Sequence, residues 1–380
     1  MSLSDPKSIG VIFGGPSPEH DVSILTGLQA ARALRQARQG EVHAIYWTKG
    51  ERFYAVNPEL EAAAFIEGAP SGARELRLVA QPGGGFFLAK PGLWGGKQRP
   101  IELDALVNCC HGGPGEDGTL QGALDMAGVR YTGPGAATAN LCMDKLAFGA
   151  MVEAMGLPSL PRKLVLPGSE PPAWDGPFIV KPRFGGSSIG IEVIGQWSDV
   201  VRYAELGGPH SARGLVAEPY HSEAYDVQVG VRAYPALSLS LFERPLRSAG
   251  AGQILGYSDK YLGGEGMVSA PKELPAQLAP ALEKELREAA LAVGRHLGVR
   301  GIWRIDFLIE GAGSWWLNEV NTIPGSLAKY LWTGEAAVAM PTLLSDMVSE
   351  ARSAPSSQWS SAGADGSALR SASSIASKLG

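Results

Sequence analysis

The chain has 380 residues, of which 45% are hydrophobic and 19% are charged, and its formal net charge is −5. This composition is typical of a globular protein, and it lacks the basic surplus of proteins that bind nucleic acid. No apolar run is long enough to span a bilayer and the N-terminus lacks the layout of a signal peptide, so we expect a cytoplasmic protein. At about 150 residues per domain, the length predicts two or three domains.

The first part of the chain is predicted to be an open α/β domain. Short apolar runs predict buried strands at residues 8–14, 42–48, 103–110 and 129–132. A helix is expected at 24–38, after the first strand and its loop. Residues 50–100 are rich in Gly and Pro, and we interpret them as short strands and loops at the edge of the domain. In open α/β sheets, ligands gather at the C-terminal ends of the strands, so a site is expected near the loops there.

The loop after the strand at 103–110 has the spacing of a dinucleotide-binding fingerprint. Gly113, Gly115 and Gly118 match G-x-G-x-x-G between a predicted strand and a predicted helix. An NAD-dependent dehydrogenase must therefore be considered. Two features oppose it, because the next strand ends without the acidic residue that would hold the adenosine ribose, and Glu116 and Asp117 would repel a pyrophosphate.

The middle of the chain predicts a second domain that begins with a helix at residues 140–155. Strands are expected at residues 178–182, 190–194 and 214–220. The sequence RFGGSSIG at 183–190 joins the first two of these strands, and its backbone N–H groups are free to approach an anion. Because the chain has no Walker sequence G-x-x-x-x-G-K-[ST], any use of ATP must rely on a different phosphate-binding loop.

The last part of the chain predicts long strands followed by an amphipathic helix. The strands are expected at 225–234 and 236–244, with a Gly-rich loop at 256–271 after them. The apolar face of the helix is formed by Leu278, Leu282, Leu286, Val293 and Leu297, and Gly298 ends it. From about residue 351 the sequence is small and polar, which predicts a loosely held tail.

Residues 301–325 predict a β-hairpin with strands at 301–310 and 314–322. Apolar and polar residues alternate, so an even-length turn places Asp306 opposite Glu319 and Arg304 opposite Asn321 on one face. The other face is predicted to be a core face, formed by Trp303, Ile305, Phe307, Ile309, Trp316 and Val320.

The polar face of this hairpin suggests a metal site. Two carboxylates about 5 Å apart at Cβ repel each other unless a cation lies between them. Carboxylate and amide oxygens are the donors that Mg²⁺ prefers, so Asp306, Glu319 and Asn321 are candidate ligands. The alternative is a solvated strand face on which Arg304 simply pairs with the two acids.

Several motifs together resemble the ATP-grasp ligases, namely Lys145, Lys181 in FIVKP, the GGSSIG loop, Glu218 in VAEPY, and the set Asp306, Glu319 and Asn321. Within that superfamily, the sequences GGPSPEHDVS, HGGPGEDGTLQG, YTGPGAATANLCMDK, KYL and NEVNTIPG are similar to those of D-alanine–D-alanine ligases. The resemblance extends from about residue 8 to residue 345.

The resemblance implies an α/β protein with the ATP-grasp fold, α+β in the ATP-binding half, and an N-terminal open α/β domain. The implied segments are an N-terminal α/β substrate domain at 1–137, a central ATP-grasp subdomain at 138–218, a C-terminal ATP-grasp subdomain at 219–350 and a tail at 351–380. ATP would lie between the central and C-terminal subdomains.

The resemblance also assigns a nucleotide site. Lys145 and Lys181 would hold the phosphates of ATP, and the loop that contains Ser187 and Ser188 would close over them. The adenine and ribose contacts would come from Glu218, the backbone of Pro219 and Tyr220, and Asp226. Asp226 departs from the family, which usually has Glu at this position.

In the family reaction, an amino-acid carboxylate attacks the γ-phosphate to give an acyl phosphate, and the amine of a second amino acid then displaces phosphate. The resemblance implies two Mg²⁺ ions, with Mn²⁺ as an alternative, on Asp306, Glu319 and Asn321. Arg304 and the N–H of Gly325 would stabilise the tetrahedral oxyanion.

The resemblance further implies a pocket for the first substrate. Glu19 would pair with its ammonium group, and Glu19, Ser187 and Tyr261 match a hydrogen-bonded trio that locks the closed loop. Ser23 and His111 match positions near the same pocket. For His111, a substrate-binding role and a purely structural role are both left open.

At the second substrate the chain departs from the family. Family members have a serine five residues after the glycine of NTIPG, where it helps the counterpart of Lys260 to hold the second carboxylate. Tyr330 stands at that position here. Its phenol must either narrow the second pocket or point away and leave the carboxylate to Lys260 and Lys329.

These observations predict an ATP- and Mg²⁺-dependent ligase that joins two D-alanine molecules for peptidoglycan precursor synthesis. Its partners would be small amino-acid substrates, with no nucleic acid or membrane, and assembly as a homodimer is left open. The alternatives are a ligase with a different small amino or hydroxy acid acceptor, the dehydrogenase considered above, and a non-catalytic ligand-binding protein that kept the fold.

Overall fold

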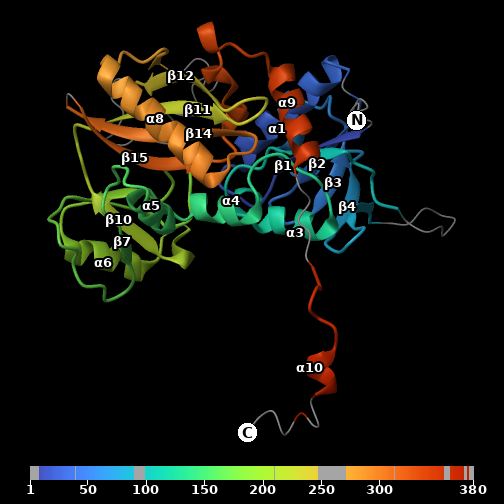
Figure 1. Ribbon diagram of the computed structural model, residues 1–380, viewed down its shortest axis with the longest axis horizontal. Coiled ribbons are helices and arrows are strands. Elements are labelled where there is room, and N and C mark those ends of the chain that lie inside the picture. The colour runs from blue at the N-terminus through green and yellow to red at the C-terminus, as the bar shows by residue number, and fades with distance from the viewer. Residues whose placement is uncertain are drawn as a thin grey trace.

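The computed structural model describes residues 8–38, 40–89, 99–208, 210–246, 271–311, 313–354, 360–371 and 375. The described strands form three sheets, and one sheet falls in each of the three predicted domains (Figure 1). The boundaries between these domains remain a prediction.

The N-terminal sheet has the strand order β5-β4-β3-β2-β1-β6. Its strands are β1 (Ser8–Gly14), β2 (Glu41–Trp47), β3 (Phe53–Val56), β4 (Arg74–Val79), β5 (Gly85–Leu88) and β6 (Ala105–Asn108). Strand β1 pairs parallel with β2 and β6, whereas β2 to β5 pair antiparallel at the sheet edge, as the Gly- and Pro-rich segment predicted. The helices of this region are α1 (His20–Gln36), η1 (Ala62–Phe65), α2 (Gly113–Glu116), α3 (Thr119–Ala127) and α4 (Ala136–Met143).

The central sheet has the strand order β7-β10-β8-β9 and is antiparallel. Its strands are β7 (Lys163–Val165), β8 (Phe178–Pro182), β9 (Glu192–Ile194) and β10 (Leu215–Pro219), and the helices of this region are α5 (Lys145–Ala154), α6 (Trp197–Leu206) and η2 (Ser211–Arg213). Helix α6 packs on the sheet through Val200, which contacts a small core that includes Phe178, Val180 and Leu215. The predicted anion-binding loop joins β8 to β9.

The C-terminal sheet has the strand order β13-β12-β11-β14-β15. Its strands are β11 (Tyr225–Arg232), β12 (Ser238–Pro245), β13 (Lys272–Glu273), β14 (Ile302–Glu310) and β15 (Ser314–Asn321). The predicted amphipathic helix, α8 (Pro280–Leu297), crosses one face of this sheet and buries Leu286 and Val293 against it (Figure 1). The later helices are η4 (Gly325–Leu331), η5 (Gly334–Ala336), α9 (Met340–Ser353) and α10 (Ser367–Arg370).

A one-residue bulge interrupts the β14–β15 hairpin. The register shifts between Asp306 and Phe307, so that Phe307 faces Leu317 and Asn318 is an extra residue on β15. The prediction that Trp316 lies on the core face is therefore wrong, because Trp315 and Leu317 occupy the core. A bulge reverses the facing of every side chain beyond it, and the alternation of the sequence does not mark its position.

Two other expectations need correction. The helix predicted at 140–155 is two helices, since Asp144 has extended backbone angles and its carboxylate caps α5 by accepting from the N–H groups of Leu146 and Ala147. The strand predicted at 129–132 is only an isolated bridge between Tyr131 and Leu106, and the chain bends directly after it, at Thr132 and Gly133.

The N-terminal and C-terminal regions share a hydrophobic core. Phe13 of β1 and Leu28 of α1 belong to the same buried cluster as Leu327 of η4, Trp332 and Leu344 of α9. Helices α1 and α9 lie side by side (Figure 1). The described central sheet has a separate core, so the site between the central and C-terminal sheets is bounded by two independently packed bodies.

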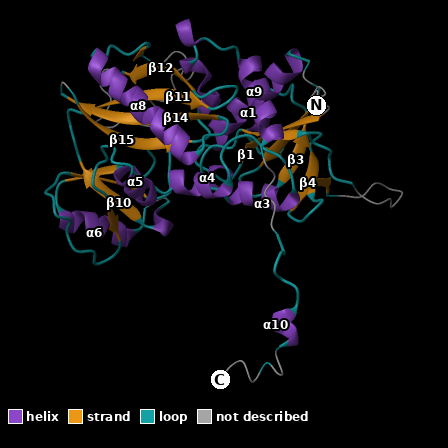
Figure 2. Cartoon of the chain, viewed as in Figure 1, coloured by secondary structure: helices purple, strands orange, loops and turns teal. Residues whose placement is uncertain are grey.

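Among the described residues, no helix has the length and apolar character that are needed to cross a membrane. Beyond α9, the described segment 360–371 is exposed along almost all of its length. Figure 2 shows this segment, with α10, extending away from the three sheets.

Two glycines in helices test the close packing of α1 on β1. A Cβ on Gly27 of α1 would lie 2.4 Å from atoms of the buried Phe13 ring, whereas a Cβ on Gly122 of α3 would meet nothing within 4 Å. Gly27→Ala should destabilise the protein by about 1–3 kcal/mol, because overpacking outweighs the gain in helix propensity. Gly122→Ala should stabilise it by roughly 0.5–1 kcal/mol. Thermal unfolding of both variants checks this, and a higher midpoint for Gly27→Ala would contradict the packing described.

Candidate active site

A cleft lies between the central and C-terminal sheets. Every residue that was predicted to bind nucleotide lines it, together with residues of the hairpin, and the lining includes Lys145, Lys181, Ser187, Ser188, Glu218, Pro219, Tyr220, Asp226, Arg304, Asp306 and Glu319. These residues come from α5, β8, the loop 183–190, β10, β11 and the β14–β15 hairpin. The fold therefore gathers segments that are separated by up to 174 positions in the sequence, from Lys145 to Glu319.

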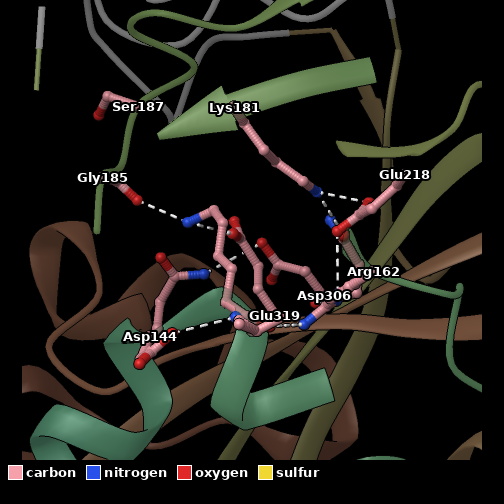
Figure 3. A network of polar contacts seen from close by, with 12 residues as sticks. Asp144, Arg162, Lys181, Gly185, Ser187, Glu218, Asp306 and Glu319 are labelled. Atoms are coloured by element: carbon pink, nitrogen blue, oxygen red, sulfur yellow. Dashed lines mark hydrogen bonds and ion pairs between the residues drawn. The ribbon is translucent and has the colours of Figure 1, made fainter. Parts of the chain in front are cut away.

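Glu218 is the buried centre of an ion-pair cluster in this cleft. Its side chain is fully buried on β10, where Oε2 lies 2.8 Å from Nζ of Lys181 and Oε1 lies 2.9 Å from Nε of Arg162 (Figure 3). Lys181 stands on the neighbouring strand β8, and its Nζ also donates to Oδ1 of Asn318 at 3.4 Å. One carboxylate thus faces two cations from two different segments.

The pKa shifts show which charge dominates this cluster. Burial alone would raise the pKa of Glu218, but Lys181 and Arg162 lower it by more, so its pKa lies below the ordinary value and the group stays ionised. Burial also lowers the pKa of Lys181, and the neighbouring carboxylate of Glu218 only partly offsets this shift. Lys145 adds a further positive charge near Glu218. Three cations therefore converge at this end of the cleft, where they could hold a phosphate chain.

Lys145 connects this cluster to the loop 183–190. Its Nζ donates to the carbonyl oxygen of Gly185 at 2.6 Å and lies 3.5 Å from Oε2 of Glu319 (Figure 3). Ser187 and Ser188 in the loop have φ values of 52° and 59°, in the left-handed region that few non-glycine residues adopt. The loop is held in a specific bent conformation beside the lysine, as expected of a loop that contacts an anion.

The acid-bearing face of the hairpin has the predicted pairing. Asp306 lies opposite Glu319, and Arg304 lies opposite Asn321. Arg304 donates two hydrogen bonds to Asp306, both of 2.7 Å, and Asn321 donates a third at 3.1 Å. Both Arg304 and Asp306 are buried, so the interpretation as a solvated strand face is wrong, although the pairing of Arg304 with Asp306 that it included is present.

The donor set on this face fits a hard divalent cation. Asp306 and Glu319 line the same cleft as Lys145 and Lys181, and Asn321 adds an amide beside them. Within the described ranges, no group of three or more His, Cys, Asp or Glu side chains could hold a metal. A cation would therefore need oxygens from the ligand as well, which is how Mg²⁺ is usually bound with phosphates.

A second, smaller cavity adjoins the cleft on the N-terminal side. It is lined by Glu19, His111, Glu116, Ser187, Arg304, Glu319, Asn321, Ile323, Pro324 and Gly325. The hydroxyl of Ser187 donates to Oε1 of Glu19, so two members of the predicted trio are in contact. The third member, Tyr261, lies outside the described residues, as does Lys260.

His111 holds the segment that follows β15. Its Nδ1 donates to the carbonyl oxygen of Ile323 at 2.5 Å, which leaves Nε2 to accept from the hydroxyl of Thr26 at 2.8 Å. The same hydroxyl oxygen accepts from the N–H of Ser326 at 3.0 Å. Burial lowers the pKa of His111, which favours the neutral ring that this arrangement requires. His111 therefore has a structural role in positioning residues 323–326, and it still faces the smaller cavity.

Glu116 is a functional residue that sequence reasoning missed. The loop of the apparent dinucleotide fingerprint ends in α2, where the carboxylate of Glu116 accepts from the N–H groups of Gly112 and Ile323, each at 2.9 Å, and from the hydroxyl of Thr322 at 3.1 Å. Burial raises its pKa to about 7, and the carboxylate of Glu19 adds to the shift. The glycine-rich loop thus carries Glu116, whose carboxylate holds the residues that follow β15. The signal in the sequence was an acidic residue among glycines.

Two predicted substrate residues lie elsewhere. Ser23 is fully buried, and its hydroxyl donates to the carbonyl oxygen of Cys109 and accepts from the N–H of Gly14. It ties β1 to the end of β6 and does not line either described cavity. The Tyr330 hydroxyl accepts from Nη1 of Arg304 at 3.4 Å, and Lys272 lies over its ring. Tyr330 is also absent from the described linings of both cavities, which favours the expectation that it points away from the second substrate.

Arg162 and Glu243 are two further residues that sequence reasoning missed. Arg162 lies in the connection between α5 and β7, far in sequence from its partner Glu218. Glu243 lines the cleft from β12, opposite Gln228, and burial raises its pKa to about 7. Neither residue belongs to a recognisable motif, because each acquires its surroundings only through long-range packing.

A cleft between two antiparallel sheets, with buried lysines on one side and an acid-bearing hairpin on the other, is the arrangement of the ATP-grasp ligases. Sequence comparison is more specific. The family model described as "D-ala D-ala ligase N-terminus" matches residues 8–134, and that described as "D-ala D-ala ligase C-terminus" matches residues 172–349. The chain belongs to the D-alanine–D-alanine ligase family.

Individual relatives agree with this assignment. The chain is 31% identical over 376 residues to a D-alanine–D-alanine ligase of Methylobacterium sp. (strain 4-46), covering 91% of each chain. It is 28% identical over 326 residues to that of Campylobacter lari, covering 85% of this chain and 88% of the relative.

Solved structures share the fold. The D-alanine–D-alanine ligase from Helicobacter pylori aligns with a TM-score of 0.70 at 24% identity, covering 93% of this chain and all of that one. The VanG D-Ala:D-Ser ligase from Enterococcus faecalis aligns with a TM-score of 0.71 at 23% identity, covering 91% of this chain and 99% of that one. The ATP-grasp fold predicted from the motifs is confirmed.

Replacing Glu116 with Gln should make stability less dependent on pH. The pKa of Glu116 is about 7 in the folded protein against an ordinary value of 4.5. The protonated carboxyl therefore stabilises the folded protein at low pH. This contribution to the free energy of unfolding, up to roughly 3 kcal/mol, is lost as the pH rises through the range between these two pKa values. The unfolding midpoint of the wild type should fall relative to Glu116→Gln between pH 5 and pH 8. The same substitution at the exposed Glu67 is the control, and parallel curves for all three proteins would contradict the assignment.

Proposed function

We propose that this protein joins two D-alanine molecules at the expense of ATP, through an acyl-phosphate intermediate, for peptidoglycan precursor synthesis. The observation that carries the proposal is the cleft in which Lys145, Lys181 and Glu218 face the acids of the hairpin, in a chain whose two halves both match the D-alanine–D-alanine ligase family. The dehydrogenase accounts for neither feature, and a non-catalytic binding protein that kept the fold is distinguished by the turnover assay below.

The first step is phosphoryl transfer. A carboxylate oxygen of the first D-alanine attacks the γ-phosphorus of ATP, the bond to the β,γ-bridging oxygen breaks, and ADP leaves. Lys145 and Lys181 hold the phosphates as point charges, and the loop with Ser187 and Ser188 covers them. Glu218, the backbone of Pro219 and Tyr220, and Asp226 hold the adenosine. Glu19 pairs with the ammonium group of the substrate, and its contact with Ser187 links substrate binding to loop closure.

Asp306, Glu319 and Asn321 would hold Mg²⁺, as two ions or with Mn²⁺ in their place. When bound, such ions neutralise charge on the β- and γ-oxygens of the nucleotide. Glu319 is also close to Lys145, so the hairpin and α5 both act on the phosphate end of the cleft.

The second step forms the peptide bond. The neutral amine of the second D-alanine attacks the acyl carbon, the tetrahedral adduct collapses, and the C–O bond to phosphate breaks as the amine loses its proton. Arg304 and the N–H of Gly325 would stabilise the oxyanion of the adduct. The clamp formed by His111, Glu116 and Thr26 holds the segment around Gly325 in place.

A different acceptor is the second candidate, and the likeness to a D-Ala:D-Ser ligase is the observation that favours it. Lys260 is proposed to bind the carboxylate of the acceptor, with Lys329 as a further candidate. We also infer a cytoplasmic location and leave open the assembly of a homodimer.

The proposed function is tested by ADP release with ATP, Mg²⁺ and D-alanine, together with the mass of the product. D-alanine, D-serine, D-lactate, glycine and L-amino acids should then compete as acceptors at fixed ATP. A product with the mass of D-alanyl-D-alanine supports the proposal. A preference for an acceptor without a carboxylate, or nucleotide binding without turnover, would contradict it.

Charge on the hairpin should be needed for turnover. Glu319→Gln and Asp306→Asn should each lower kcat by about 100-fold or more, because metal-assisted charge neutralisation contributes several kcal/mol. The unfolding midpoint of Glu319→Gln should stay near that of the wild type, whereas Asp306→Asn should lower it, because Asp306 is the buried ion-pair partner of Arg304. Near-normal rates at low Mg²⁺ would rule out the metal assignment.

Arg304→Ala should also lose about 100-fold in kcat while nucleotide affinity is largely kept, since its role is at the acyl centre.

Tyr330→Ser should reduce turnover with D-alanine and not improve it. The tyrosine is buried against Arg304, so its removal leaves an aromatic-sized cavity beside a residue of the acyl centre. We expect kcat to fall by roughly tenfold or more, with Tyr330→Phe as the matched control that keeps the ring. Faster use of D-alanine by Tyr330→Ser would mean that the phenol narrows the second pocket after all.

A further inference from the structure

Arg162 is a buried arginine that no step above uses. It lies just before β7, and its side chain is 4% exposed. Its Nε faces Oε1 of Glu218 at 2.9 Å, its Nη2 donates to the carbonyl oxygen of Asn318 at 2.6 Å, and its Nη1 donates to the carbonyl oxygen of Lys145 (Figure 3). The ring of Phe148 lies beneath the guanidinium, with its centroid 6.0 Å away.

These three contacts join the parts of the site that would meet different ends of the nucleotide. Glu218 stands at the proposed adenine position, and Lys145 begins α5 at the proposed phosphate position. Asn318 is the bulge residue directly before Glu319 on the hairpin. The segment that carries Arg162 is itself fixed to the hairpin, because the N–H of Leu317 donates to the carbonyl oxygen of Pro158 at 2.9 Å.

The two cations on Glu218 differ in how freely they can leave it. Lys181 has a flexible stem and a second, weaker acceptor in Asn318 Oδ1 at 3.4 Å, and phosphates of a nucleotide would compete for its ammonium group. The guanidinium of Arg162 is anchored at both Nη atoms to backbone carbonyls. When Lys181 turns to a phosphate, a fully buried carboxylate remains, and a buried charge without a partner is strongly unfavourable.

We propose that Arg162 is a positioning residue for nucleotide recognition, which remains on Glu218 as its permanent counter-ion while Lys181 is drawn to the phosphates. Glu218 then stays an anion that accepts a hydrogen bond from the exocyclic amino group of a purine. The same guanidinium keeps the start of α5 and the bulge before Glu319 at a fixed distance from that carboxylate. The inference rests on the proposed function only in taking ATP as the nucleotide.

The experiment measures nucleotide binding by calorimetry, without amino acids, using the non-hydrolysable imido analogues of ATP and of ITP. ITP carries a carbonyl oxygen in place of the amino group, so an ionised Glu218 should reject it. Arg162→Met keeps the apolar stem and removes the charge. We expect it to bind the ATP analogue at least tenfold more weakly and to lose most of its preference over the ITP analogue. Arg162→Lys, which keeps the charge but not the fork, should lie between Arg162→Met and the wild type.

A double variant separates positioning from a merely structural role. If Arg162 acts through the charge of Glu218, then Arg162→Met with Glu218→Gln should bind the ATP analogue better than Arg162→Met alone, because no buried anion is left without a partner. Arg183→Met is the matched control. The Nε of Arg183 donates to Oδ1 of Asp144, the N-cap of α5, at 2.7 Å, and Arg183 does not contact Glu218. It should leave the purine preference unchanged.

Several results would overturn the proposal. Retention of the purine preference in Arg162→Met, or no relief from Glu218→Gln, would show that the guanidinium only packs. If thermal unfolding shows that Arg162→Met does not fold, Arg162→Lys is used in its place. An unchanged purine preference in Arg162→Lys would then contradict the proposal. Failure of the wild type to bind the ATP analogue would instead refute the use of ATP in the proposed function.

Discussion

The site depends on a buried carboxylate that is surrounded by positive charge. Lys181, Arg162 and Lys145 surround the buried carboxylate of Glu218, and burial of the lysine is tolerated only because that carboxylate is ionised beside it. In a low-dielectric interior such a set is stable only as a group, since removal of one charge leaves another unpartnered. The rest of the cleft is arranged around this group, with a bent loop on one side and acids on the hairpin on the other.

A second set of contacts fixes the end of the hairpin. Residues Ser326, Leu327 and Ala328 have φ values of 48°, 49° and 50°, a run that is unfavourable for residues with a side chain. The N-terminal region holds this run in place, since Thr26 accepts from Ser326 while His111 and Glu116 bind Ile323 just before it. Leu327 and Ala328 are buried in the shared core as well. Local strain next to the proposed oxyanion donor, Gly325, is therefore balanced by contacts from a different part of the chain.

The sequence was most informative where a signal is local. Period-two alternation predicted Asp306 opposite Glu319 on the assumption of an even-length turn. The pairing is present, but the turn between Glu310 and Ser314 has three residues, and the bulge at Asn318 restores the register. The bulge at Asn318 broke the same reasoning for Trp316, since one unpaired residue leaves no mark in composition. The helix break at Asp144 had a local signal, an N-capping residue, that the apolar periodicity concealed. Arg162 had none, because its partner Glu218 lies 56 positions away along the chain. Tyr261 and Lys260 lie outside the described residues, so their roles remain predictions.

The shared core of β1, α1, η4 and α9 has a consequence for how this chain can be recombined. Because Phe13 and Leu28 pack in one cluster with Leu327, Trp332 and Leu344, the N-terminal and C-terminal regions form one cooperative unit even though the central sheet separates them in the sequence. A chimera that takes the N-terminal region from a relative would bring a mismatched surface to η4 and α9, whereas an exchange of the central sheet would leave that core intact. The two ends of the polypeptide are thus constrained to change together, and the middle is constrained separately, through Phe148 and Val152 in the core of the C-terminal sheet and through Arg162 at the hairpin.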